Sequence, residues 1–341
     1  MKGEISSGAN SGSFGFLQKI DLFGYVPELL YKGETSHSTR YGGLVSVTAA
    51  LGYIGVVSFT VWRYFQREAP ATNVETKFVP DPPGFTWDRD NFPFAFGIQD
   101  TTATHFIDDQ IYTVEATYNL KTTSKVSGEE VINYDSITIP LIRCSEAKLD
   151  PQYFNNIPLA DMYCLREFIN PLKRFQITGR WESQTFGTLS FNFRKCNTTS
   201  STCKSAEEIS KRLKDSYFAV YFIDRVLKAS DFENPWQVIP RSQYMSTSIA
   251  YTKYLSYYIQ ENTVASDSSL IGYLQPKQQT FLSVGVQYSD MSNLALDTSE
   301  LPSIFLSFVF RMSTSQVIVT RKYKNIYDYL AEFGGMSQVV S

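Results

Sequence analysis

A long apolar run near the N-terminus is the most pronounced pattern in the sequence. No charged residue occurs between Arg40 and Arg63, and residues 44–61 are mostly Leu, Val, Ala, Ile, Gly and Phe. A helix needs about 20 such residues to cross the hydrocarbon core of a bilayer. The run therefore predicts a transmembrane helix over 41–64. The alternative is a central helix of a large soluble domain, which also tolerates apolar residues on every side.

The residues at the ends of this run are typical of a membrane interface. Trp62 and Tyr64 lie at the exit, where aromatic side chains form an interfacial belt. Gly42, Ser46 and Ala50 recur at a spacing of four residues, which puts small side chains on one helix face and lets a second helix approach closely. The spacing directs attention to a second span.

Beyond the apolar run, apolar and polar residues alternate. Residues 65–95 contain Pro80, Pro82 and Pro83, which exclude a helix and predict an extended connector. Residues 96–322 contain β-branched and aromatic segments with a period of two, separated by Gly, Asn, Asp and Pro. These predict a mainly β domain of the antiparallel β-sandwich type. The strands are expected at 110–120, 136–142, 174–183, 188–196, 218–227, 247–259, 280–288 and 304–323.

One segment of this domain has a helical pattern instead. Ser205 and Glu208 have the spacing of a capping box. Ile209 and Leu213 then fall on one face of the segment 205–218. We expect a single short helix there.

The two ends of the chain have different patterns. Residues 1–40 begin with a Ser/Gly/Asn-rich stretch that lacks the apolar core of a signal peptide, and predict a flexible cytosolic tail with a short amphipathic segment. Residues 323–341 contain Gly334 and Gly335 and lose charge toward the end. This juxtamembrane segment is either an amphipathic surface helix or the start of a second span that is cut short. In the second case the glycines would serve helix packing.

Composition changes this picture little. A hydrophobic fraction of 43% and a net charge of -3 would also suit a soluble β-rich protein. The weak acidity leaves no basic surface for nucleic acid, and no Lys/Arg cluster with interleaved aromatic residues occurs. Nucleic-acid binding is therefore excluded as an expected function.

The cysteines indicate the compartment. Cys144, Cys164, Cys196 and Cys203 all follow the apolar run, and an even number on one side favours two disulfides in an oxidising lumen or outside the cell. Pairing near neighbours, 144–164 and 196–203, is the economical connectivity, and four free buried thiols are the alternative. Asn197 begins an Asn-Thr-Thr glycosylation sequon in the second loop. Together these signals predict a lumenal or extracellular, glycosylated domain.

Catalysis, cofactors and metals are not expected. The sequence has no nucleophile-elbow, zinc-protease, P-loop or dinucleotide motif, and it has only two histidines. No cysteine pair has the spacing of a zinc site. The acidic pairs Asp88/Asp90 and Asp108/Asp109 are interpreted as solvated turns, because no third group accompanies them in the sequence.

Several short motifs resemble known families. IDLFG, TRYGGLVS, the apolar run and the aromatic exit are similar to a group of ciliate two-pass transmembrane proteins with a Cys-containing β-rich ectodomain. The spacing of the cysteines, of Gly179-Arg180-Trp181 and of the EEI helix is also similar to that group. More distantly, the chain resembles the ER–Golgi intermediate compartment family of cargo receptors, which implies vesicular transport, although a complete second span is absent here. The resemblance gives a role at the point where the chain enters the membrane, and in helix contact, to Thr39, Gly42, Gly43, Gly334 and Gly335.

These observations predict a non-catalytic interaction protein, integral to a membrane of the secretory pathway or cell surface. It would contact the lipid bilayer and bind other membrane or lumenal proteins as a homo- or hetero-oligomer, and its Tyr and Phe content suits such contacts. One alternative is an ER–Golgi cargo receptor. Others are a subunit of a two-span ligand-gated channel, whose architecture the chain also resembles, and an accessory subunit of a large membrane complex. The expected interaction surface contains Tyr251, Tyr254, Tyr257 and Tyr258. Packing in the core explains the alternation of this segment equally well.

Overall fold

The computed structural model describes residues 39–66, 70–126, 129–166, 176–197, 202–269, 271, 275–292 and 303–340 of the chain. The chain divides into two compact units. The helical unit comprises residues 1–69, 269–273 and 323–341, and the β unit comprises 70–268 and 274–322. The tail and the amphipathic segment predicted over 1–40 lie almost wholly outside the described residues.

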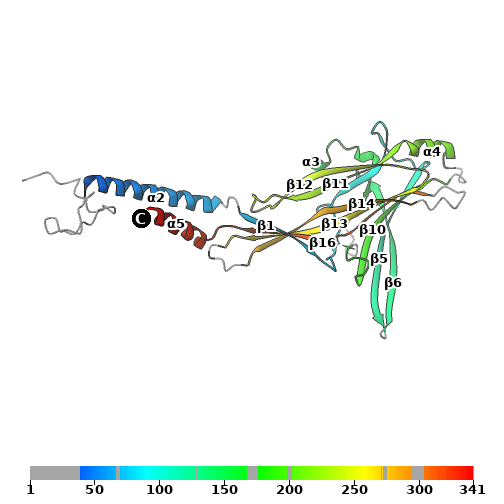
Figure 1. Ribbon diagram of the computed structural model, residues 1–341. Coiled ribbons are helices and arrows are strands. Elements are labelled where there is room, and N and C mark those ends of the chain that lie inside the picture. The colour runs from blue at the N-terminus through cyan, green and yellow to red at the C-terminus, as the bar shows by residue number, and fades with distance from the viewer. Residues whose placement is uncertain are drawn as a thin grey trace, which may run out of the picture. The chain divides into compact units, whose positions relative to one another are not determined.

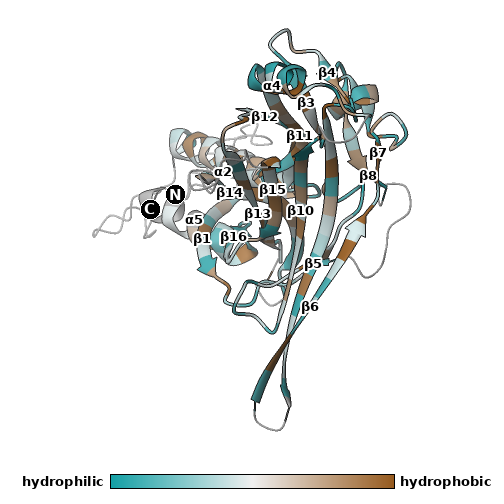
Figure 2. Cartoon of the chain, turned by 90° about the vertical axis from the view of Figure 1, so that its right-hand side faces the viewer, coloured by the Kyte–Doolittle hydropathy of each residue, from teal (hydrophilic) through white to brown (hydrophobic). Residues whose placement is uncertain are grey.

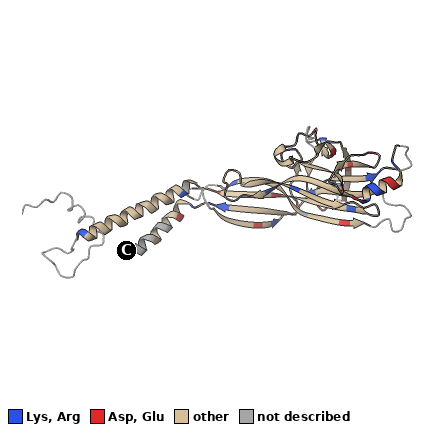
Figure 3. Ribbon diagram, turned by 90° about the horizontal axis from the view of Figure 1, so that it is seen from above, with Lys and Arg blue, Asp and Glu red and all other residues tan. Residues whose placement is uncertain are grey.

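Helix α2 (Arg40–Gln66) contains the apolar run. It begins after Thr39, whose Oγ1 accepts a hydrogen bond from the N–H of Gly42 at 3.0 Å and caps the first turn. Lys and Arg occur only near the ends of this helix (Figure 3). Arg40–Arg63 is long and apolar enough to cross a membrane, and only 6% of its most apolar window is buried. A core helix of a soluble domain would bury most of this surface, so the structure favours the membrane-spanning prediction.

Helix α5 (Ile326–Val340) follows the β unit. Asn325 and Asp328 cap it reciprocally, because each side chain accepts a hydrogen bond of 2.9 Å from the other's N–H. The C-terminal segment is therefore helical over Ile326–Val340.

The larger sheet of the β unit has eight strands (Figure 1). They are β1 (Ala71–Phe78), β5 (Tyr112–Val126), β6 (Glu129–Ile139), β10 (Thr185–Lys195), β13 (Thr252–Asp267), β14 (Lys277–Ser292), β15 (Ile304–Met312) and β16 (Ser315–Lys322). Their order is β1-β16-β13-β15-β10-β5-β6, with β14 paired to β13. Among these strands, β13 runs parallel to β15 and β16, and the other pairs are antiparallel.

The smaller sheet has six strands in the order β12-β11-β3-β8-β7, with β4 paired to β3. A two-stranded sheet and short helices complete the unit. The strands of the smaller sheet are β3 (Phe94–Asp100), β4 (His105–Phe106), β7 (Leu141–Arg143), β8 (Tyr163–Leu165), β11 (Ser216–Leu227) and β12 (Trp236–Ser246). The two-stranded sheet contains β2 (Phe85–Thr86) and β9 (Gln176–Ile177). The short helices are α3 (Pro151–Phe154), η1 (Leu159–Asp161) and α4 (Ala206–Lys214).

Aromatic side chains join the two larger sheets. Phe191 of β10 stacks on Phe308 of β15, with ring centroids 4.3 Å apart. From the smaller sheet, Phe96 lies 4.8 Å from Phe191, and Phe218 lies 5.0 Å from Phe308. All four are fully buried, because alternate residues of each strand face the same layer. The two open sheets therefore pack face to face, as the period-two pattern predicts.

Several details of the predicted element pattern need correction. The predicted strand 174–183 contains only the two-residue strand β9, and residues 180–183 form a turn. The predicted antiparallel arrangement contains two parallel pairs, β13 with β15 and β13 with β16. Residues 71–78 of the predicted connector form β1, an edge strand paired with β16. The predicted strand 304–323 is two strands, which separate at Ser313 and Thr314. The sequence pattern missed β12 because Pro240 interrupts it, and Pro is tolerated there because β12 lies at the end of the sheet.

Candidate functional site

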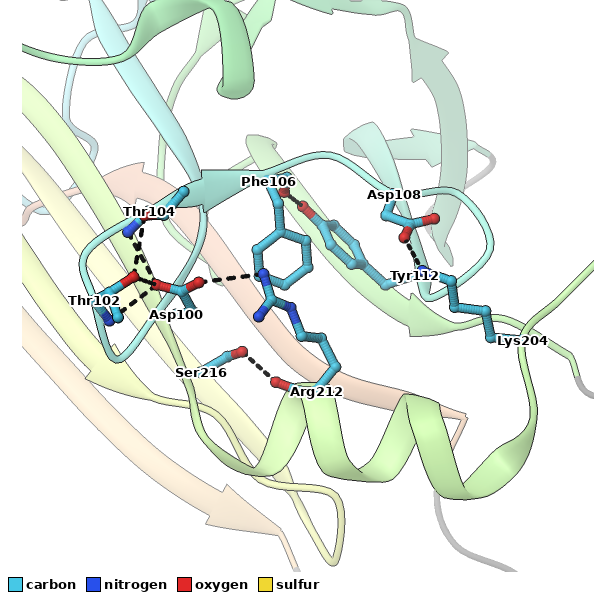
Figure 4. Close-up of polar contacts among 9 residues, drawn as sticks. All are labelled: Asp100, Thr102, Thr104, Phe106, Asp108, Tyr112, Lys204, Arg212 and Ser216. Carbon is cyan, nitrogen blue, oxygen red and sulfur yellow. Dashed lines mark hydrogen bonds and ion pairs between the residues drawn. The ribbon is translucent and has the colours of Figure 1, made fainter.

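A surface pocket of about 720 Å³ lies beside α4. One wall is the connection from β3 to β5, and the other is α4 with the residues that precede it (Figure 4). Asp100 and Asp108 come from the first wall, and Lys204 and Arg212 come from the second. The pocket therefore combines acidic and basic groups from two segments that are far apart in the sequence.

Asp100 ends β3 and organises the loop that follows it. Its carboxylate accepts hydrogen bonds from the N–H of Thr102 (2.9 Å), the Oγ1 of Thr102 (2.6 Å) and the N–H of Thr104 (3.0 Å). The hydrogen bond from the Thr102 side chain is the largest influence on Asp100, whose pKa is lowered. The carboxylate is therefore charged at neutral pH and available to Arg212, whose Nη2 lies 3.2 Å from its Oδ2.

Arg212 attaches α4 to this loop in two ways. Besides the ion pair, its guanidinium lies over the ring of Phe106, 4.4 Å from the centroid. The hydroxyl of Ser216 donates a hydrogen bond to the Arg212 carbonyl and so secures the end of α4 (Figure 4). A planar guanidinium suits such stacked and paired contacts.

A second ion pair closes the other end of the pocket. Lys204 Nζ lies 2.6 Å from Oδ2 of Asp108. Burial is the largest single influence on Asp108 and acts to raise its pKa, but the hydrogen bonds from Lys204 and from the N–H of Gln110, together with the positive charges of Lys204 and Arg212, outweigh burial and the pKa is lowered. Nearby, the Tyr112 hydroxyl donates a 2.6 Å hydrogen bond to the Phe106 carbonyl. In this arrangement each carboxylate is matched with a cation, and the two ion pairs anchor α4 to the β3–β5 connection.

His105 lies in the core behind this loop. Its side chain is 5% exposed, and neither ring nitrogen has a hydrogen-bond partner among the described residues. Burial lowers the pKa of His105, against the opposing fields of Asp161 and Asp100. Its ring lies 5.9 Å from that of Tyr221. His105 is therefore a neutral packing residue near neutral pH.

The β5–β6 hairpin forms the second conspicuous surface. β10 pairs with β5 only as far as Thr122. In the register of the described strands, residues 123–126 and 129–132, here termed the arm, pair with each other. The N–H of Thr123, at the base of the arm, also donates a 2.6 Å hydrogen bond to the carbonyl of Gln184. The hairpin projects from the sheet (Figures 1 and 2). Residues 129–138 of β6 are all exposed. An isolated two-stranded hairpin is marginal in water, so the arm is suited to a further strand.

Aromatic residues flank β6 where the arm begins. Tyr134, Lys121 and Phe186 are register partners on β6, β5 and β10 and form one row across the sheet. Trp181 covers this row, with Lys121 Nζ 4.6 Å from its ring centroid and the Tyr134 ring 6.3 Å away. Tyr134 is 66% exposed and Trp181 56%. Two large aromatic side chains are thus left in solvent beside a free sheet edge.

A tight turn places Trp181 over this row. Gly179 has a φ of +63°, and a Cβ at this position would lie 2.0 Å from the carbonyl oxygen of Thr185. The hydroxyl of Ser183 accepts a 3.0 Å hydrogen bond from the N–H of Arg180 and closes the turn. Only glycine fits there without strain.

The cysteines form the two disulfides that the sequence favours. Cys144 pairs with Cys164, and Cys196 pairs with Cys203. The first is fully buried beside β7 and β8, and the second closes the loop before α4. Asn197 is exposed in this loop, as a glycan acceptor requires, although Thr199 of the sequon lies outside the described residues.

The tyrosine surface expected from the sequence does not form as a unit. Tyr257 is fully buried and packs on Phe310, with ring centroids 5.1 Å apart, so its assignment to the surface is wrong. Tyr254 is exposed, and Tyr251 and Tyr258 are half-buried. Core packing, the other explanation of the alternation in this segment, applies to Tyr257, because β13 is a central strand whose two faces are both partly covered.

The small residues proposed for helix packing differ in their surroundings. No heavy atom lies within 4 Å of a Cβ position at Gly334 or Gly335. On α2, Ser46 is buried, Gly42 is half-buried and Ala50 is exposed. Helix packing through these positions stays a prediction.

Sequence reasoning missed the pocket, the arm and Trp181. The pocket depends on ion pairs between segments far apart in the sequence, which no local pattern shows. The sequence carries a signal for the arm, because the segment EEVINYDSITI has apolar residues on both faces. The predicted strand 136–142 covers only the end of this segment.

The comparisons with known proteins give a family and two remote structural similarities. A family model described as "Uncharacterised 80 kDa protein N-terminal domain" matches residues 95–313. No curated protein matches the chain.

Two solved structures are remotely similar. One is titled "Cryo-EM structure of a proton-activated chloride channel", with 8% identity, a TM-score of 0.26, and coverage of 87% of this chain and 90% of that chain. The other is titled "Crystal Structure of Erv41p", with 12% identity, a TM-score of 0.18, and coverage of 72% of this chain and 99% of that chain. These TM-scores do not establish a common fold.

Proposed function

Because the chain belongs to the family of the uncharacterised 80 kDa protein N-terminal domain, whose description states no activity, we propose a function from its own geometry. It is a membrane-anchored, non-catalytic interaction protein that binds partner proteins or neighbouring subunits through its disulfide-stabilised β unit.

The observation that carries this proposal is the open edge of the larger sheet at β6. Residues 129–138 present exposed side chains and a strand edge that no other described strand pairs with, and Val131, Ile132, Tyr134 and Ile137 are apolar. Such an edge is a template for pairing with another chain, and natural proteins protect edges with charged side chains, especially Lys, with Pro or with bulges. β6 contains neither Lys nor Pro, its pairing with β5 is regular, and its acids, Glu129, Glu130 and Asp135, leave residues 131–134 without charge. The edge is therefore suited to a partner.

The anchor is α2, whose apolar length matches a bilayer and whose side chains are largely free of protein contacts. The two disulfides support a lumenal or extracellular position for the β unit, because disulfides persist in oxidising compartments. The exposed Asn197 supports a glycan on the same side. The proposal assigns no catalysis, since Asp100 and Asp108 are engaged by Arg212 and Lys204.

A subunit of a two-span channel is a second candidate. Ala71 and Lys322 are register partners, so the segments leading from α2 and into α5 leave the sheet at one end of one strand pair. A two-span protein needs this connection if both helices enter the same bilayer. An ion-flux assay in liposomes that contain the purified full chain tests this candidate, and flux above that of empty liposomes supports it.

Native purification tests the interaction function. The full chain is extracted in mild detergent, and the mass of the particle and of every co-purifying protein is measured. A defined oligomer or a stoichiometric partner set is the expected result. A lone chain that stays in solution without detergent contradicts both the anchor and the interaction function.

A further inference from the structure

We propose that the partner at β6 is a second copy of this chain, which adds its own β6 antiparallel across a two-fold axis through Tyr134. This inference rests on the proposed function, because it names the partner that an interaction protein of this kind would bind. The two larger sheets would then join as β5-β6-β6-β5, and no free edge would remain at β6.

The arm gains a second strand partner from this pairing. Among the described residues, 129–132 have strand partners on one side only. Those partners, 123–126, lie beyond the end of the β5–β10 register, and of them Thr123 hydrogen-bonds to the Gln184 carbonyl. In the two-fold arrangement, residues 129–132 of each copy lie opposite residues 136–139 of the other. Each two-stranded arm then becomes part of a four-stranded sheet, which is stable where an isolated hairpin is not.

The sequence of β6 is complementary to itself in this register. Val131 of one copy lies opposite Ile137 of the other, and Asn133 lies opposite Asp135, each pair occurring twice by symmetry. Val131 and Ile137 are both exposed in the single chain. Opposite residues point to the same face and lie in side-chain contact. The register therefore buries apolar residues together and places an amide against each carboxylate.

The neighbouring registers that keep the same two-fold geometry lack this match. A centre at Asn133 puts Val131 opposite Asp135 and Ile137 opposite Glu129. A centre at Asp135 puts Asp135 of one copy opposite Asp135 of the other. A centre at Ile132 puts Asp135 of each copy opposite Glu129 of the other. Like charges directly opposite each other destabilise a strand pair. Only the centre at Tyr134 pairs the apolar residues and avoids every acid–acid contact.

The aromatic row supplies the centre of the interface. In a single chain the row of Phe186, Lys121 and Tyr134 ends at the free edge. With Tyr134 on the axis, the row continues through the second Tyr134 into the same residues of the other copy. Trp181 lies over this row on each side, and its exposed surface flanks the junction. Aromatic cross-strand pairs are among the favourable ones in sheets, and Tyr and Trp are enriched where interfaces are strongest.

A charge substitution on the full chain in detergent tests the register. Asn133→Asp places two pairs of carboxylates opposite each other, and we expect the dimer association constant to fall by about tenfold or more. Adding Asp135→Asn restores one amide opposite each carboxylate and should return the constant to within about threefold of the wild type. Asn73→Asp, the same change on the other exposed edge strand β1, is the matched control and should have no effect.

A single cysteine tests the two-fold centre directly. With Tyr134→Cys, two copies meet at the axis and form an intermolecular disulfide under mild oxidation, seen as a dimer on a non-reducing gel. Ile132→Cys faces Ser136 of the other copy and should not cross-link. If Cys at 134 does not cross-link and Asn133→Asp leaves the particle mass unchanged, the second-copy inference is wrong. If these tests fail but other proteins co-purify with the chain, the interaction function still holds. A wild-type chain that purifies alone would contradict both the second-copy inference and the interaction function.

Discussion

Ala71 and Lys322 are register partners at the end of the antiparallel β1–β16 pair. α2 ends at Gln66 and β1 begins at Ala71, while β16 ends at Lys322 and α5 begins at Ile326. The segment from the first helix and the segment to the last helix therefore meet the β unit side by side. The chain therefore enters the larger sheet after α2 and leaves it before α5 at the same end of one strand pair.

The register can be checked with engineered cysteines. Cα atoms of directly opposite residues in an antiparallel pair are about 4.5–5.5 Å apart, which is within the range of a disulfide. Ala71→Cys combined with Lys322→Cys should form an intramolecular disulfide that peptide mass mapping detects. Ala71→Cys combined with Gln316→Cys, whose partner is Lys77, should not. Equal cross-linking in both variants would show that the register is wrong.

The two native disulfides should differ in their contribution to stability. The Cys144–Cys164 bond closes a loop with a sequence separation of 20, and Cys196–Cys203 one with a separation of 7. From loop-closure entropy we expect a loss of about 3 kcal/mol for the first and about 2.5 kcal/mol for the second on replacing both cysteines by Ala. The first pair is also fully buried, so its loss leaves a cavity and adds to the difference. Urea unfolding of each double variant measures this order, and a larger loss for 196–203 would contradict it.

His105 should make the folded chain less stable in mild acid. Burial lowers its folded-state pKa below the unfolded value of about 6.5. Below that pH the unfolded chain binds more protons than the folded chain, so the free energy of unfolding falls as the pH falls from 6.5 toward the folded pKa.

The variant His105→Phe retains the packing against Tyr221 and removes the titration. Its free energy of unfolding should fall less than that of the wild type between pH 7 and pH 5. Glu261, whose pKa burial raises, acts in the opposite direction in both proteins, so the difference between them isolates His105. Parallel pH curves for the two proteins would contradict the assignment.

Arg321 should be important for the stability of the β unit. Its side chain is fully buried, and it donates to the Ser266 hydroxyl at 2.7 and 3.0 Å and to the carbonyls of Ala229, Asp231 and Phe232. Arg321→Met leaves these acceptors without their donor and should lower the free energy of unfolding by about 2–4 kcal/mol. The neighbouring Lys322 is exposed, so Lys322→Met should change the free energy of unfolding by less than about 0.5 kcal/mol. Urea unfolding of both variants measures the two changes. Equal effects would show that Arg321 is not held as described.

Local patterns predicted the parts of the structure that depend on neighbouring residues. The capping box of Ser205 and Glu208 is a contact over three positions, and it forms as expected, with hydrogen bonds of 3.2 and 3.3 Å. The close spacing of the cysteines likewise predicted their pairing. Tyr257 shows the limit, because alternation in a central strand cannot distinguish a core face from an exposed one. The same holds for β12, where Pro240 hides an edge strand whose pairing with β11 decides its conformation.

The candidate sites could not be predicted in the same way. Arg212 meets Asp100 across 112 positions of sequence, and Trp181 meets Lys121 through a turn that depends on Gly179. The exposure of β6 follows from the place of that strand at the end of the sheet order, which only the three-dimensional pairing defines.

A topology measurement in sealed membrane vesicles tests the central claim most directly. The chain carries a tag before Met1 and is compared with the variant Asn197→Gln. The account predicts that the chain resists alkaline extraction, that protease added outside removes the tag but spares the β unit, and that glycosidase shifts the mass of the wild type alone. A chain that is released by alkaline extraction, or a β unit that is digested together with the tag, would contradict the claim that α2 anchors a lumenal or extracellular interaction domain.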